Sequence, residues 1–245
     1  MHGRERAKFM STSQAGTDPN AGVREKYLFW ACFVALVATA FAFIVRTQII
    51  DELQTEFSLS ETEKGMILGA GLWPFAFTIV LFSLIIDRIG YGRAMAFAWV
   101  CHAVSVVVTV TAQNYQMLYI GTIIAALGNG TVEAVINPVV ATMFTRQKVK
   151  WLNILHAGWP GGLVVGGVFA ITLGDIDWRW KVGLLLIPTV VYGVMLIGQK
   201  FPLSERVAAG VSYRDMLKEL GAVGALIIVG LMVRQLGTDF GINQT

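Results

Sequence analysis

Charged residues are scarce in this sequence, and neither sign dominates among them. Lys, Arg, Asp and Glu make up 14% of the 245 residues, against 55% for hydrophobic residues, and the net charge is +3. A soluble domain would separate its amphipathic elements by charged segments, whereas the apolar runs here are continuous. This composition excludes an ordinary soluble domain, and so small a net charge gives no reason to expect a nucleic-acid partner.

Cysteines and catalytic motifs are also nearly absent. The two cysteines, Cys32 and Cys101, lie within apolar runs, where packing as small hydrophobic residues is their usual role and a disulfide is not expected. No cysteine or histidine pair has the spacing of a metal site, and no glycine-rich phosphate loop follows a strand. No nucleophile can be paired with a base by motif. The sequence therefore argues against an enzyme and predicts no cofactor and no metal.

Long apolar runs fill most of the chain. The hydrocarbon core of a bilayer is crossed by a helix of about 20 residues. Seven runs of this kind begin at Tyr27, Gly65, Met95, Met117, Leu152, Val182 and Leu220. The sequence therefore predicts an all-α integral membrane protein that crosses the bilayer several times.

Polar segments divide the chain into four parts. Residues 1–26 are polar and basic and lack the apolar core of a secretory signal, so they are predicted to be a disordered cytoplasmic tail. Residues 27–200 are predicted to form a six-helix bundle, 201–219 a cytoplasmic loop between bundles, and 220–245 a seventh transmembrane helix. The seventh helix is expected to begin a second bundle that the chain lacks, so that the chain is truncated.

Basic residues gather in alternate loops. The loop with Arg88 and Arg93 and the loop at 146–150 are basic, the loop at 51–63 is acidic, and the acids and cations in 175–181 balance. Cytoplasmic loops carry the excess of Lys and Arg. The pattern predicts a cytoplasmic N-terminus in the inner or plasma membrane of a cell.

The first and seventh runs end alike, with V-R-x4-D at residues 45–51 and again at 233–239. Repeated halves with a solute site between them are common in secondary transporters. This match favours a duplicated six-helix unit.

The segment between the second and third runs, SLIIDRIGYGR at 83–93, resembles the G-x-x-x-D-R-x-G-R-R signature of the major facilitator superfamily. The resemblance is carried by Asp87, Arg88, Gly90 and Arg93. Ser83 replaces the first glycine, and one residue is inserted before Arg93. The resemblance implies a transporter of twelve helices in two bundles, of which this chain is the N-terminal half plus one helix. It also implies that the charged cluster holds the two halves together on the cytoplasmic side.

Glu133 lies in the middle of the fourth run, where an ionisable group is costly unless it meets a partner or a wet cavity. Asn137 is four residues later, on the same helix face, and Pro138 frees a backbone carbonyl one turn earlier. The E-x-x-x-N-P spacing resembles that of fucose, glucose and galactose proton symporters, which implies a role for Glu133 in proton coupling. The structural alternative is a buried, protonated Glu133 bonded to a neighbouring helix.

Arg46 and Arg234 favour a different solute. Arginine offers a planar fork to carboxylate or phosphate, and one arginine in each of the first and seventh helices resembles the organophosphate antiporters. Asn153 and His156 form an N-x-x-H that is similar to one in the same antiporters, which implies that His156 contacts solute. The sugar symporters carry an acidic residue in the first helix, where this sequence has Arg46. The alternatives are that Arg46 snorkels to the membrane interface and that His156 is a core histidine.

Three further patterns concern packing. The glycines at 158, 162 and 166 recur every fourth residue, which predicts a close helix contact. Trp73 and Trp159, each followed by proline, are placed to line a cavity. His102, in the third run, is expected to be a buried packing residue.

Together these patterns predict a secondary active transporter that carries a small polar solute by alternating access, coupled to protons. Glu133 would carry the proton, and the solute would be a sugar or an organic anion such as a sugar acid or organophosphate. The expected solute-binding residues are Arg46, Asn137, Asn153, His156 and Arg234. A structural or receptor-like membrane protein and an inactive transporter fragment are the alternatives. Besides solute, proton and bilayer, the expected partner is a missing C-terminal bundle or a second copy of the chain.

Overall fold

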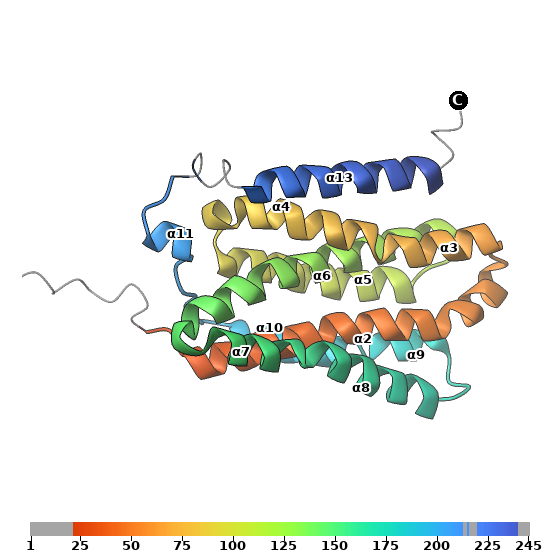
Figure 1. Cartoon of the computed structure of the whole chain (residues 1–245). Coiled ribbons are helices and arrows are strands. Elements are labelled where there is room, and N and C mark those ends of the chain that lie inside the picture. Colours follow the sequence, from red (N-terminus) through yellow and green to blue (C-terminus); the bar gives the residue numbers. More distant parts are fainter. Residues whose placement is uncertain (1–21, 213–214, 216–219, 240–245) are drawn as a thin grey trace, which may run out of the picture.

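The computed structural model describes residues 22–212, 215 and 220–239, and within these ranges it contains helices and no strand (Figure 1). The helices, in chain order, are α2 (Glu25–Phe57), α3 (Glu61–Ala70), α4 (Trp73–Ile89), α5 (Tyr91–Val110), α6 (Tyr115–Met143), α7 (Lys148–His156), α8 (Gly158–Thr172), α9 (Trp178–Gly183), α10 (Leu186–Leu196), α11 (Glu205–Ala208) and α13 (Leu220–Asp239). A short 3-10 turn, Thr145–Gln147, precedes α7.

Six of the predicted apolar runs form helices or helix pairs that are long and apolar enough to cross a membrane. They are α2, α3 with α4, α5, α6, α7 with α8, and α9 with α10. The seventh run forms α13. The segment before it, predicted as a loop, contains the short α11. The multi-pass helical fold is confirmed. Residues 1–21 of the predicted tail and 240–245 of the predicted seventh helix lie outside the described residues.

The acidic segment at 51–63 is not the loop that was predicted. α2 continues to Phe57, Ser58 ends it in the left-handed conformation (φ 51°), and Ser60 starts α3 with a capping box. Glu63 N–H donates to Ser60 Oγ at 3.2 Å, and Ser60 N–H donates to Glu63 Oε2 at 2.9 Å. The prediction was wrong because hydropathy marks the membrane boundary, whereas capping residues set the helix end.

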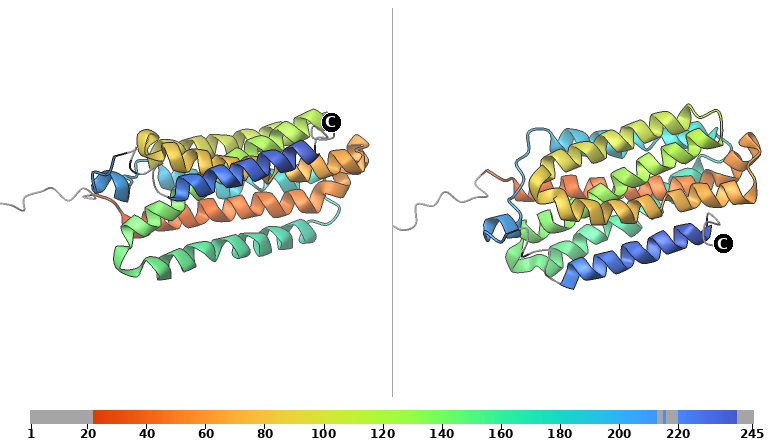
Figure 2. Two further views of the ribbon diagram at one scale, coloured as in Figure 1. Left: turned by 45° about the horizontal axis from the view of Figure 1, so that its top comes forward. Right: turned by 90° about the horizontal axis from the view of Figure 1, so that it is seen from above.

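α6 and α2 lie at the centre of the bundle. α6 packs against α5, α4 and α2, and α2 packs in turn against α8 and α10. Figures 1 and 2 show α13 along the outside of the bundle, next to α4. The helices that surround α6 therefore fix the position of its polar residues.

Glycines allow the closest helix contacts. A Cβ added to Gly162 would lie 2.7 Å from Ala40 Cβ on α2, and one added to Gly166 would lie 2.5 Å from Ile44 Cγ2. On α6, a Cβ at Gly130 would meet the Phe75 carbonyl oxygen at 2.4 Å. The predicted packing role of the glycine stripe is confirmed, and α2 and α8 are held close together by it.

Gly162→Ala is expected to lower stability because the added methyl group has no room against α2. Overpacking of this kind costs about 1–3 kcal/mol. Gly161→Ala is the matched control, because a Cβ there meets nothing within 4 Å and alanine favours a helix over glycine. Thermal unfolding in detergent should show a lower midpoint for Gly162→Ala and an equal or higher one for Gly161→Ala. Equal midpoints for the two variants would contradict the packing assignment.

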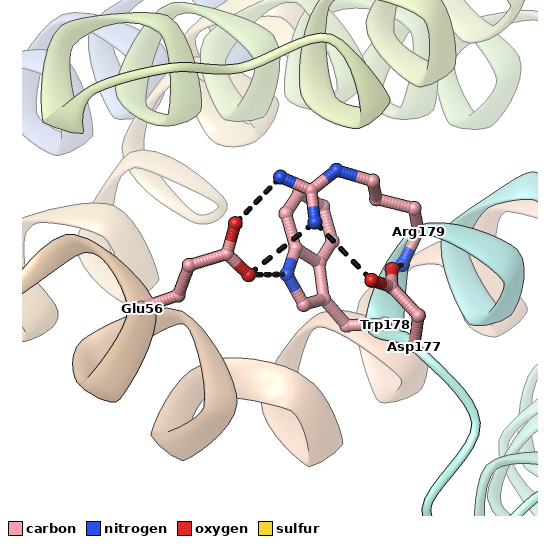
Figure 3. Close-up of polar contacts among 4 residues, drawn as sticks. All are labelled: Glu56, Asp177, Trp178 and Arg179. Carbon is pink, nitrogen blue, oxygen red and sulfur yellow. Dashed lines mark hydrogen bonds and ion pairs between the residues drawn. The ribbon is translucent and has the colours of Figure 1, made fainter.

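Ion pairs join α2 to α9 at the end of the bundle where α2 stops, here called the Glu56 end (Figure 3). Arg179 donates to both oxygens of Glu56, at 2.6 and 3.3 Å, and Trp178 Nε1 donates to Glu56 Oε2 at 2.5 Å. Asp177 also pairs with Arg179, at 3.3 Å, and the guanidinium lies 4.3 Å from the Trp178 ring centroid. Arg179 therefore pairs with Glu56 of α2 as well as with Asp177, and the contact with α2 is one that the sequence did not reveal.

Lys181 pairs with Glu52 of α2 at the same end, with an Nζ to Oε1 distance of 2.5 Å. Its side chain is 6% exposed, against 40% for Glu52. The pair forms a second contact between α2 and α9.

Glu52→Gln leaves the buried charge of Lys181 without its partner. We expect a loss on the order of 1–2 kcal/mol, below that for a fully buried pair because Glu52 is partly exposed. Asp51→Asn breaks the Lys64–Asp51 pair, in which Asp51 is 80% exposed, and should cost less than Glu52→Gln because exposed pairs contribute little. Urea or thermal unfolding in detergent compares the two, and a larger loss for Asp51→Asn would refute the prediction.

Candidate functional site

Three of the predicted site residues form a hydrogen-bonded cluster. Asn137 Nδ2 donates to Glu133 Oε2 at 3.2 Å and to the Glu133 carbonyl oxygen at 3.1 Å. Asn137 Oδ1 lies 2.9 Å from His156 Nε2. Because a carboxamide oxygen only accepts, Nε2 carries the proton and donates it to this bond. The cluster therefore joins α6 to α7.

Local sequence places these side chains. Pro138 inside α6 has no N–H, which leaves the Ala134 carbonyl without its usual helical bond. Residues Gly158 and Pro160 begin α8 immediately after α7 ends, so His156 lies at a helix break. Glu133 and Asn137 are partly buried, and His156 is exposed.

Glu133 lines two pockets. The first, of about 310 Å³, is here called the aromatic pocket. Its walls include Phe43, Leu72, Phe75, Asn129, Glu133 and Trp159. The second, of about 430 Å³, is here called the Asp87 pocket. Its walls include Ser83, Asp87, Glu133, Asn137, Thr142 and Arg206. A carboxyl group that borders two pockets can be reached by water or a solute from either pocket.

The signature residues lie at the other end of the bundle, here called the Asp87 end. Arg206 Nε donates to Asp87 Oδ2, and Arg206 Nη1 donates to the Val211 carbonyl oxygen at 2.6 Å. Gly90 has φ of 85°, which favours glycine, and ends α4. Arg88 and Arg93 are exposed at the same turn.

Sequence reasoning missed Arg206. It lies 119 residues from Asp87, in a segment predicted as a loop, and its only signal was a positive charge near the Asp87 end. Asp87 of the signature therefore pairs with Arg206 within this chain.

The remaining predicted residues lie apart from the cluster. Asn153 is exposed on α7, one turn before His156, and Arg234 is exposed on α13. Arg46 lines neither pocket beside Glu133. It borders a separate cavity of about 20 Å³ inside the bundle, together with Thr109 and Thr122.

No group of three or more His, Cys, Asp or Glu side chains in the described part of the chain is arranged to hold a metal ion.

The fold defines a multi-pass helical membrane protein. Residues 28–240 match the family model described as Major Facilitator Superfamily. The chain belongs to the Major Facilitator Superfamily, whose members are transporters and not enzymes.

Individual relatives are distant. The cis,cis-muconate transport protein of Acinetobacter baylyi is 24% identical over 172 residues, which cover 69% of this chain and 42% of the relative. The hexuronate transporter of Bacillus subtilis is 23% identical over 145 residues, which cover 58% of this chain and 34% of the relative. The chain spans less than half the length of the curated relatives it matches.

Solved structures agree on the fold. A proton:xylose symporter bound to 6-bromo-6-deoxy-D-glucose superimposes with a TM-score of 0.67 at 16% identity, over 89% of this chain and 54% of that chain. This likeness confirms the six-helix arrangement of the family.

Asp87→Asn is expected to release the segment that carries Arg206, because it removes the carboxylate that binds the guanidinium. Trypsin should then cleave after Arg206 several-fold faster in detergent solution. Cleavage within 146–150, which lies at the same end in the 3-10 turn and the start of α7, serves as the internal reference. An unchanged ratio of the two cleavage rates would show that the pair does not hold this segment.

Proposed function

We propose that this chain is part of a secondary transporter that carries a small organic carboxylate together with a proton. The observation that carries the proposal is the position of Glu133, which is bonded to Asn137 and borders both pockets. Transport would proceed by alternating access, with the six-helix bundle moving against a second bundle.

Charge repulsion would couple the proton to the solute. A carboxylate solute next to an ionised Glu133 places two negative charges in a medium of low dielectric constant, which is strongly unfavourable. Protonation of Glu133 removes the repulsion and provides a hydrogen-bond donor. Solute and proton would therefore bind together and leave together.

The choice of a carboxylate is supported by the relatives named for muconate and for hexuronate, which are both carboxylates. Asn137, His156 and Asn153 would bind the solute from the α6 and α7 side. Arg46 and Arg234 would favour an anion through their positive charge, Arg46 from its own cavity. The second candidate is a neutral sugar, favoured by the xylose symporter among the structural neighbours.

Orientation and partners follow from charge and from the family. Basic residues concentrate at the Asp87 end, which would be cytoplasmic, as would the N-terminus. The face that carries both pockets would be covered by a second six-helix bundle, supplied by a C-terminal half or by a second copy of the chain.

Glu133→Gln is expected to abolish accumulation of muconate or a hexuronate driven by a pH gradient, because glutamine cannot carry the proton. Exchange of solute in the absence of a gradient should persist, since glutamine resembles the protonated acid. Uptake into cells or liposomes measures both, and Asp175→Asn, an exposed change at the Glu56 end, is the control. Accumulation that survives in Glu133→Gln would refute proton coupling at this residue, and uptake of xylose but of no carboxylate would favour the sugar candidate.

A further inference from the structure

A buried hydrogen-bonded chain runs through the bundle to the aromatic pocket. Tyr192 Oη on α10 lies 2.9 Å from His102 Nδ1 on α5, and His102 Nε2 lies 2.9 Å from Asn129 Oδ1 on α6. The three residues are 0%, 2% and 5% exposed, respectively. His102 is buried, as expected, but it links three helices through polar contacts.

The direction of each bond in this chain is determined by its chemistry. The Asn129 carboxamide oxygen only accepts, so His102 carries its proton on Nε2. Nδ1 of the neutral ring is then an acceptor, and the Tyr192 hydroxyl donates to it. One arrangement of donors satisfies both bonds, and in it the Asn129 amide nitrogen takes no part in the bond to His102.

The backbone makes room for this arrangement. A Cβ on Gly128 would lie 2.7 Å from His102 Cδ2 and 3.0 Å from Cys101 Cβ. The glycine therefore permits the imidazole to reach α6 next to Asn129. Buried polar groups on three helices are costly unless every one is bonded. The series of hydrogen bonds ends at Asn129, which borders the aromatic pocket.

Asn129 lies one helical turn before Glu133, and both residues line the aromatic pocket. With Oδ1 bound to His102, Nδ2 is the polar group of Asn129 that remains to face the pocket. The pocket therefore combines a fixed amide donor, a carboxyl group and the aromatic rings of Phe43, Phe75 and Trp159.

We propose that Asn129 is a solute-binding residue whose amide nitrogen donates to an oxygen of the solute, and that His102 and Tyr192 are positioning residues. The solute would present a carboxylate or hydroxyl oxygen to Asn129 and lay its carbon skeleton against the aromatic rings. The proposal rests on the proposed transport function and adds a second donor beside Glu133, on the side away from Asn137.

The test compares uptake kinetics in three variants of the full chain. Asn129→Leu keeps the volume of the side chain and removes the donor, so the KM for muconate or a hexuronate should rise about 10-fold or more. Tyr192→Phe removes one hydroxyl outside the pocket and frees His102 to turn, so the KM should rise several-fold while the maximal rate stays within about twofold. Thr189→Val is the control, because it removes another buried hydroxyl of α10 that bonds to Leu185 O.

The thermal unfolding midpoint, measured for each variant, separates positioning from stability. An unchanged KM in Asn129→Leu overturns the proposal, and so does an effect of Tyr192→Phe that Thr189→Val reproduces. If the wild type carries a neutral sugar but no carboxylate, the proposed class of solute is wrong. The KM of the same variants for that sugar then decides whether Asn129 binds the solute. A wild type that neither carries nor binds any of these solutes overturns both proposals.

Discussion

A polar side chain within the hydrocarbon region needs a hydrogen-bond partner, on its own helix or on a neighbouring one, and this requirement organises the interior of the protein. α6 carries three such residues at intervals of four, Asn129, Glu133 and Asn137, which lie along one helix face. Asn129 is bonded to His102, and Asn137 is bonded to His156. The two histidines thus fix the ends of a polar stripe with the carboxyl group at its centre.

The two ends of the bundle pair their charges differently. At the Glu56 end, carboxylates of α2 are bonded to cations of α9, so both partners belong to the six-helix bundle. At the Asp87 end, Asp87 is bonded to Arg206, on the segment that leads to α13. The ion pairs at the Glu56 end therefore lie within the six-helix bundle, whereas the ion pair at the Asp87 end links the bundle to the segment between α10 and α13. In the proposed transport cycle, the Asp87 end would therefore be the one whose ion pair changes as the bundles move.

Hydropathy and helical spacing were sufficient to predict the six apolar spans of the bundle and the shared face of Glu133 and Asn137, because both are local properties. The end of α2 was misplaced because capping residues, and not hydropathy, determine it. The contact of His156 with this cluster was not predicted, because resemblance suggested only that His156 contacts solute. Tyr192 and Arg206 were missed because their partners lie 90 and 119 residues away in the sequence, and no local pattern reports such distances.

The central claim is that Glu133 takes up the proton that accompanies the solute. It is tested most directly by counting protons as muconate or a hexuronate binds to the purified protein in weakly buffered detergent solution near neutral pH. The account predicts that the wild type takes up roughly one proton per bound carboxylate, and that Glu133→Gln binds the same solute with no proton uptake. Equal proton uptake by the two proteins, or solute binding to the wild type without any, would contradict it.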